Sequence, residues 1–135
     1  MAKSQLKHDT PDLPPVGIDG MITFLYYKDL AKVARFYEDV LGLKLVIDQG
    51  FAKIYKVAGK AHIGLVDETR GYHRSNPIKP VEITLVVSDV DAWYQRIRSL
   101  GIETLSEPTI MQSVNVQAFL LLDPEGYVLE IQKFL

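Results

Sequence analysis

The sequence predicts an α+β protein built from two tandem copies of a strand–helix–strand–strand–strand (βαβββ) module. The first observation is a repeat, because the segments ITFLYYKDL and ITLVVSDV can be aligned so that Asp29 falls on Asp89, 60 positions later. The second is that the glycines expected to end the two helices, Gly42 and Gly101, lie 59 positions apart. A repeat of this period indicates two modules of one architecture.

The first module is predicted at residues 18–67. Its first strand, residues 21–27, is β-branched and aromatic, and Asp29 can cap the helix that follows. Apolar residues recur along this helix at three- and four-residue steps until Gly42 ends it. Turn signals then separate three short runs that we expect to be strands, at residues 43–48, 51–59 and 61–67.

The second module is predicted at residues 81–135, after a connector at residues 68–80 that is rich in proline and polar groups. A strand at residues 81–87 leads to the cap candidates Ser88 and Asp89 and to a helix that Gly101 closes. Further strands are expected near residues 102–105 and at residues 108–114, 116–122 and 127–134. Residues 1–17 contain three prolines, and we expect them to form an extended N-terminal arm.

Composition limits the functions that the chain can have. The 135 residues are 47% hydrophobic and 24% charged, as in an ordinary globular protein with the length of one domain. The 15 basic and 17 acidic residues are interspersed, so no basic surface is available for nucleic acid. The lack of cysteine excludes disulfides, zinc–thiolate sites and a thiol nucleophile.

Targeting and catalytic motifs give little guidance. No stretch approaches the roughly 18 apolar residues that a membrane span needs, and the first residues contain no signal-peptide core. We therefore expect a cytoplasmic protein without a membrane partner. The sequence has no phosphate loop, dinucleotide fingerprint, GxSxG elbow or HExxH helix, so nucleotide use and serine or zinc hydrolysis lack local support.

Three segments carry a family resemblance: DLAKVARFYEDVLGLKL in the first module, SDVDAWYQRIRSLGI in the second, and the closing DPEGYVLEI. In this order and spacing they resemble the vicinal oxygen chelate superfamily, the glyoxalase/bleomycin resistance/dioxygenase group. The resemblance covers about residues 18–134. It implies two βαβββ modules that form a curved mixed sheet around a cup for a small-molecule ligand. Members commonly pair, and we therefore expect a homodimer.

The resemblance also implies where metal ligands would stand. In metal-using members each module supplies one ligand from its first strand, seven residues before the helix-capping aspartate, and one from its last strand. These positions are Ile22 and Gly64 in the first module and Glu82 and Glu130 in the second. We therefore expect an incomplete metal site and no cofactor. A divalent metal would need a shifted third ligand, for which His62 on the same strand face as Gly64 is the candidate.

Strand alternation places Glu82, Thr84 and Glu130 on the face of the second module that points away from its core. In the family's module the first and last strands are neighbours, which would bring the two glutamates together. Two close carboxylates disfavour joint ionisation, so that one takes a proton or a cation joins them. We interpret Glu82 and Glu130 as candidate catalytic residues and Thr84 as a ligand-binding residue. The alternative is that both acids are simply solvated.

The same face of the first module is predicted to be an apolar, aromatic wall. Ile22, Phe24 and Tyr26 lie on its first strand and His62 on its last, and we predict that they bind the ligand, together with Tyr55. The alternatives are that Tyr26 belongs to the core or a dimer surface and that His62 is an ordinary strand histidine. The connector adds polar groups that could fold over a pocket and bind an anion: Arg70, Tyr72, His73 and Arg74.

Three functions remain open on the sequence. The first is a glyoxalase-like small-molecule cup with an incomplete metal site, which acts by ligand binding or by metal-free acid–base chemistry. The second is a metal-dependent lyase, isomerase or oxygenase that uses Glu82, Glu130 and a shifted third ligand. The third is a non-catalytic dimeric binding module, suggested by the apolar face of the first module.

Overall fold

The computed structural model describes residues 13, 15 and 17–135. Most of the predicted N-terminal arm therefore lies outside the described residues. Within the described part of the chain, no helix is long and apolar enough to cross a membrane.

The first module forms a four-stranded sheet with one helical segment. Its elements are β1 (Met21–Tyr27), α1 (Leu30–Arg35), the π-helix η1 (Phe36–Val40), β2 (Lys44–Asp48), β3 (Ala52–Ala58) and β4 (Ala61–Asp67). The strand order is β1-β4-β3-β2, in which β1 and β4 are parallel and the other pairs antiparallel. The first and last strands of the module are therefore neighbours.

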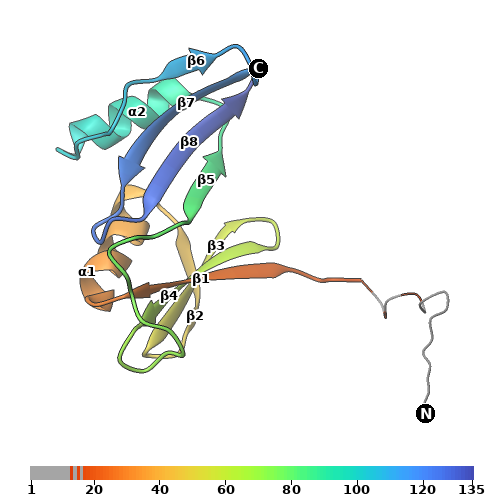
Figure 1. The fold of residues 1–135 in the computed structure, drawn as a ribbon, viewed down its shortest axis with the longest axis vertical. Coiled ribbons are helices and arrows are strands. Elements are labelled where there is room, and N and C mark those ends of the chain that lie inside the picture. The colour runs from red at the N-terminus through yellow and green to blue at the C-terminus, as the bar shows by residue number, and fades with distance from the viewer. Residues whose placement is uncertain (1–12, 14, 16) are drawn as a thin grey trace.

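The second module repeats this arrangement. Its elements are β5 (Glu82–Val86), α2 (Val90–Ser99), β6 (Thr109–Met111), β7 (Val116–Leu122) and β8 (Val128–Phe134). The strand order is β5-β8-β7-β6, and β5 and β8 are again the parallel pair. Figure 1 shows α2 lying along one face of this sheet and α1 beside the turn between β7 and β8.

Matching caps begin and end the two helical segments. The side chain of Asp29 accepts a hydrogen bond from the backbone N–H of Lys32 at 3.1 Å, and Asp89 accepts one from Ala92 at 2.9 Å. Gly42 and Gly101 follow the helices in the left-handed region, with φ of 70° and 78°. The first helix ends in a π-helical turn, because the N–H of Leu41 bonds to the carbonyl of Phe36 instead of the closer Tyr37.

The predicted fold class is confirmed, with three differences in detail. The strand predicted at residues 108–114 spans only Thr109–Met111, because a turn follows it. Each module forms its own four-stranded sheet, so the eight strands make two mixed sheets and not one continuous curved sheet. The strand predicted near residues 102–105 is absent from both sheets. This segment contacts β7 through one backbone bond, from the N–H of Leu105 to the carbonyl of Leu120 at 2.7 Å, and no ladder follows.

One hydrophobic core serves both modules. Its buried side chains come from β1, α1, η1, β3 and β4 on one side and from α2, β7 and β8 on the other; among the largest are Tyr27, Tyr37, Tyr55, Phe119, Leu65, Ile97 and Leu129. Because the core crosses the boundary between the sheets, each module contributes to the stability of the other.

A buried polar cluster lies in this shared core. Asp123, in the turn between β7 and β8, is only 4% exposed. Its Oδ2 accepts hydrogen bonds from the hydroxyls of Tyr27 (2.6 Å) and Tyr37 (3.0 Å), and its Oδ1 accepts bonds from the N–H groups of Glu125 and Tyr127 at 3.0 Å each. These four donors replace the water that burial removes. We call Tyr27, Tyr37 and Asp123 the tyrosine–aspartate cluster.

Two further side chains join the modules at the ends of the first helical segment. The carboxylate of Glu125 accepts bonds from the N–H groups of Lys28 (2.8 Å) and Asp29 (2.7 Å), where the segment begins. The guanidinium of Arg96 donates to the carbonyls of Asp39 and Val40, 3.0 Å each, where it ends. The DPEG segment, residues 123–126, therefore provides contacts that fix one module against the other.

Candidate functional site

Each sheet has one face covered by helices and one face that is free of them, which we call the helix-free face. On β1 the core-facing Leu25 is 2% exposed, whereas Ile22 and Phe24 on the other face are 40% and 43% exposed. On β8 the core-facing Leu129 is fully buried and Glu130 is half-buried. The predicted alternation is therefore confirmed on both strands, and it presents the candidate residues on the helix-free faces.

The structure brings together Glu82, Thr84 and Glu130. Thr84 lies opposite Glu130 in the parallel β5–β8 ladder. Its hydroxyl donates to Oε1 of Glu130 at 2.9 Å and lies 3.4 Å from Oε2 of Glu82. A single hydroxyl proton serves one carboxylate at a time, so Thr84 can transfer its bond from one acid to the other. We call these three residues the acid–threonine group.

The environment of the acid–threonine group suits acid–base chemistry. Glu82 and Thr84 are exposed and Glu130 is half-buried, so a ligand can reach all three. A carboxylate that accepts one hydroxyl bond still has lone pairs for a substrate proton. The group could also bind a ligand rich in hydroxyls or a cation.

His62 lies near two of these three residues, Glu82 and Thr84. Together with Glu82 and Thr84 it lines a shallow hollow of about 250 Å³ between β1, β4 and β5, which Glu130 does not line. Its Nδ1 lies 3.3 Å from the carbonyl oxygen of Lys60. Among the residues that the structure describes, no three His, Asp or Glu side chains are grouped closely enough to hold a metal ion.

The ligand positions of the first module do not fit a metal centre of the family's kind. Ile22 has no donor atom, and Gly64 lies under the ring of Phe24. A Cβ placed on Gly64 would approach Cδ1 of Phe24 to 2.4 Å, so a ligating side chain would require this ring to move. An aromatic ring therefore occupies the space in which a metal ligand would stand.

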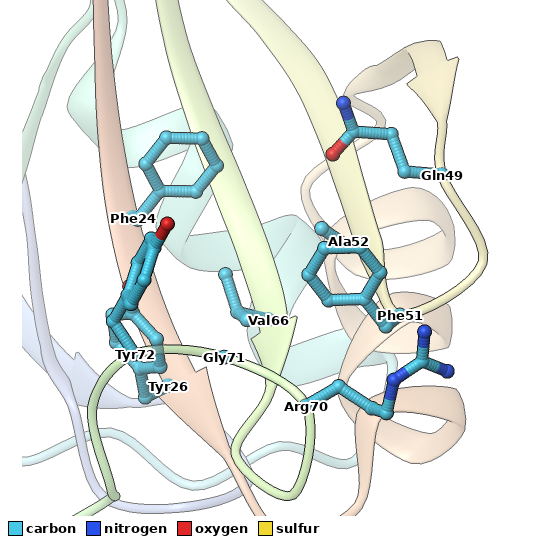
Figure 2. A pocket seen from close by; sticks show the side chains of 9 residues that line it. All are labelled: Phe24, Tyr26, Gln49, Phe51, Ala52, Val66, Arg70, Gly71 and Tyr72. Carbon is cyan, nitrogen blue, oxygen red and sulfur yellow. The ribbon is translucent and has the colours of Figure 1, made fainter.

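A larger hollow, of about 360 Å³, lies on the helix-free face of the first module. It is lined by β1, by the β2–β3 turn, by the start of β3, by β4 and by the connector: Phe24, Tyr26, Gln49, Phe51, Ala52, Val66, Arg70, Gly71 and Tyr72. Figure 2 shows Phe24 and Tyr26 on one side, Phe51 and Arg70 on the opposite side, and Val66 and Ala52 between them. We call it the aromatic hollow.

The connector wall of this hollow is held by its own hydrogen bonds. Nη1 of Arg74 donates to the carbonyls of Glu68 (2.7 Å) and Gly71 (3.1 Å). The Glu68 carboxylate accepts bonds from the hydroxyl (2.7 Å) and N–H (2.9 Å) of Ser75, which lower its pKa. His73 packs edge-on against Tyr26, with ring centroids 5.1 Å apart. The wall is therefore formed before a ligand arrives.

The residues predicted from the sequence to form the site thus lie in different parts of the structure. Phe24 and Tyr26 line the aromatic hollow, as Arg70 and Tyr72 of the connector do. The prediction that Tyr55 lines the cavity is wrong, because its side chain is fully buried in the core and its hydroxyl donates to Oε2 of Glu38 at 2.5 Å. Alternation explains this, since Tyr55 pairs with the core-facing Ile63 of β4.

Sequence reasoning missed several residues of the aromatic hollow. Gln49 and Phe51 belong to the β2–β3 turn, and Ala52 and Val66 form the floor. Phe51 was predicted as the first residue of the strand at residues 51–59 but lies in the turn before β3, and the curvature that brings it opposite β1 is a property of the whole sheet. Its aromatic ring next to Gly50 was the one local hint.

The paired modules and their open faces define a class of protein, and a family comparison agrees with it. The model described as "Glyoxalase/Bleomycin resistance protein/Dioxygenase superfamily" matches residues 20–131. The chain belongs to this superfamily. No curated protein matches the sequence significantly.

Solved structures with the same fold have varied descriptions. A lactoylglutathione lyase from Agrobacterium tumefaciens is 25% identical, with a TM-score of 0.69 over 89% of this chain and 95% of that one. A glyoxalase/bleomycin resistance protein/dioxygenase from Nocardioides is 21% identical, with a TM-score of 0.72 over 91% and 87%. TioX from Micromonospora sp. ML1 is 20% identical, with a TM-score of 0.71 over 86% and 98%. The last two show the fold alone.

Proposed function

We propose that the protein binds a small organic molecule on its helix-free faces and acts on it, or sequesters it, without a metal. The observation that carries this proposal is that the Phe24 ring covers Gly64, which stands at one of the family's ligand positions. Glu130 and Glu82 supply the acid–base groups, and Thr84 holds the hydrogen bond between them.

The proposal includes a homodimer. The helix-free faces carry exposed apolar side chains, of which Ile22 and Phe24 lie in the first module and Val86 (61% exposed) and Phe134 (64%) in the second. A second copy that covers them would remove this surface from water and could bring an aromatic hollow near an acid–threonine group.

The dimer is checked by sedimentation equilibrium. We expect twice the mass of the 15.2 kDa chain, and we expect Phe134→Glu to shift the protein towards the monomer. A monomer at all accessible concentrations would contradict this part of the proposal.

Ligand binding is checked by thermal shift against a set of small organic acids, alcohols and amines, with and without a chelator. We expect some members to raise the unfolding temperature and the chelator to have no effect. Glu130→Gln should weaken binding of the best ligand by about tenfold, because one charge-assisted hydrogen bond is lost. Glu103→Gln, at an exposed position, is the matched control and should bind normally.

Other outcomes favour other functions. Unchanged ligand binding in Glu130→Gln would count against a role for the acid–threonine group. Near-stoichiometric metal in protein purified without chelator, lost in Glu130→Ala, would favour the metal-dependent lyase, isomerase or oxygenase. If no small molecule stabilises the fold, the non-catalytic binding module remains.

A further inference from the structure

We infer that the aromatic hollow selects a planar aromatic anion, with the ring between its two walls and the acidic group at Arg70. This inference rests on the proposed function and specifies the chemical class of its ligand. It concerns the first module, whereas the acid–base groups belong to the second.

The walls favour a flat ring. Phe24 and Tyr26 stand on β1, and the Phe51 ring faces them across the hollow, as Figure 2 shows. Val66 and Ala52 form an apolar floor between the walls. Aromatic side chains on opposite sides favour the stacked and edge-on contacts that rings make with one another. The volume, about 360 Å³, is at the lower end for ligand pockets and suits a compact molecule.

Arg70 supplies a positive charge at the rim. Its guanidinium carbon lies 5.2 Å from the centroid of the Phe51 ring, and the side chain is exposed. Within the described residues no carboxylate lies within ion-pair distance of this guanidinium. The carboxylate of the nearby Asp67 interacts with Arg70 through its charge but makes no hydrogen bond to the guanidinium, and its Oδ1 accepts hydrogen bonds from the N–H (2.9 Å) and hydroxyl (2.7 Å) of Thr69. The planar fork of Arg70 is therefore available for two parallel bonds to a ligand carboxylate or sulfonate.

The backbone fixes Arg70 at this place. The N–H groups of Arg70 (3.1 Å) and Gly71 (3.0 Å) both bond to the carbonyl of Asp67, which forms a tight turn directly after β4. A Cβ on Gly71 would lie 2.7 Å from Tyr26 Cε2 and from Val66 Cγ1. The backbone at Gly71 thus approaches Tyr26 in the wall and Val66 in the floor as closely as only glycine allows. This close approach fixes the position of the preceding residue, Arg70.

Besides Arg70, the polar side-chain groups of the lining are the amide of Gln49 and the hydroxyls of Tyr26 and Tyr72. Carboxylates are absent from the lining, and Asp67, whose charge interacts with Arg70, lies outside it. A neutral ring of the same shape would gain the wall contacts alone. Charge should therefore separate two ligands that are otherwise matched.

The test uses 2-naphthoate and its neutral amide, 2-naphthamide, in isothermal titration calorimetry on the full-length protein. We expect 2-naphthoate to bind about tenfold more tightly, as one charge-assisted pair implies. Arg70→Gln should remove this preference and leave 2-naphthamide binding unchanged. Arg98→Gln changes the net charge equally at an exposed site on α2, and it should keep the preference. Ala52→Leu fills the floor and should weaken both probes.

The results separate the contribution of the aromatic ring to binding from that of the negative charge. Equal affinity for the two probes, or a preference that survives Arg70→Gln, overturns the assignment of an anion but leaves the proposed function standing. Absence of binding by both probes overturns the aromatic ligand class. The proposed function fails separately, when the wider ligand set does not stabilise the fold. Arg70 is exposed, so its variant is expected to fold even if Ala52→Leu does not.

Discussion

Replacing Asp123 with alanine is expected to lower the free energy of unfolding by about 3–5 kcal/mol. The carboxylate is 4% exposed and accepts hydrogen bonds from two buried hydroxyls and two backbone N–H groups. Alanine would leave all four donors without this acceptor in a site that is almost completely buried. Urea denaturation followed by circular dichroism measures the loss.

The control is Glu125→Gln in the same turn. Its partners, the N–H groups of Lys28 and Asp29, are exposed to water, so we expect a loss of only about 1 kcal/mol. Tyr27→Phe combined with Asp123→Ala should cost less than the two single changes together, because the partners share one network. A loss near that of Glu125→Gln for Asp123→Ala would show that the cluster contributes little.

Alkaline solution is expected to destabilise the protein steeply. Burial, with a contribution from the Asp123 carboxylate, raises the pKa of both Tyr27 and Tyr37 well above the ordinary value of 10.0. In the unfolded chain both ionise near pH 10, whereas in the folded protein they keep their protons. Their contribution to stability is therefore complete below pH 10 and is lost progressively above it, by about 1.4 kcal/mol per pH unit for each tyrosine.

This pH dependence is measured by chemical denaturation at a series of pH values below and above 10.0, the ordinary pKa of tyrosine. Tyr37→Phe should reduce the slope of the unfolding free energy against pH by about 1.4 kcal/mol per pH unit, the contribution of one proton, since phenylalanine has no group to ionise. Leu129→Ala, in the same core, is the control: it lowers stability by creating a cavity but should keep the full slope. A flat profile in the wild-type protein would contradict the buried, protonated state of these hydroxyls.

Much of the fold follows from local signals in the sequence. Asp29 and Asp89 cap the helices as predicted, and the strands predicted at Met21–Tyr27, Ala61–Asp67 and Val116–Leu122 have those bounds. These elements depend on neighbouring residues only, namely a cap, a left-handed glycine or an alternating pattern. The acid–threonine group followed from alternation combined with the strand order that the family resemblance implied.

Other features depend on residues far apart in the chain. The role of Asp123 could not be predicted, because its partner Tyr27 lies 96 positions away and the local sequence describes only a turn. The aromatic hollow needs Phe51 and Phe24 to face each other across the sheet, which no local pattern expresses. Tyr55 was misplaced because a tyrosine on a strand suits a core as well as a cavity, and only the register decides.

The shared core has a consequence for any attempt to divide the chain. Neither half contains a complete hydrophobic interior, since the side chains that fill it come from both. A polypeptide cut within the connector would therefore yield two fragments that are each poorly structured alone. Mixed together, they would regain the native fold by complementation, with the cluster around Asp123 formed between them.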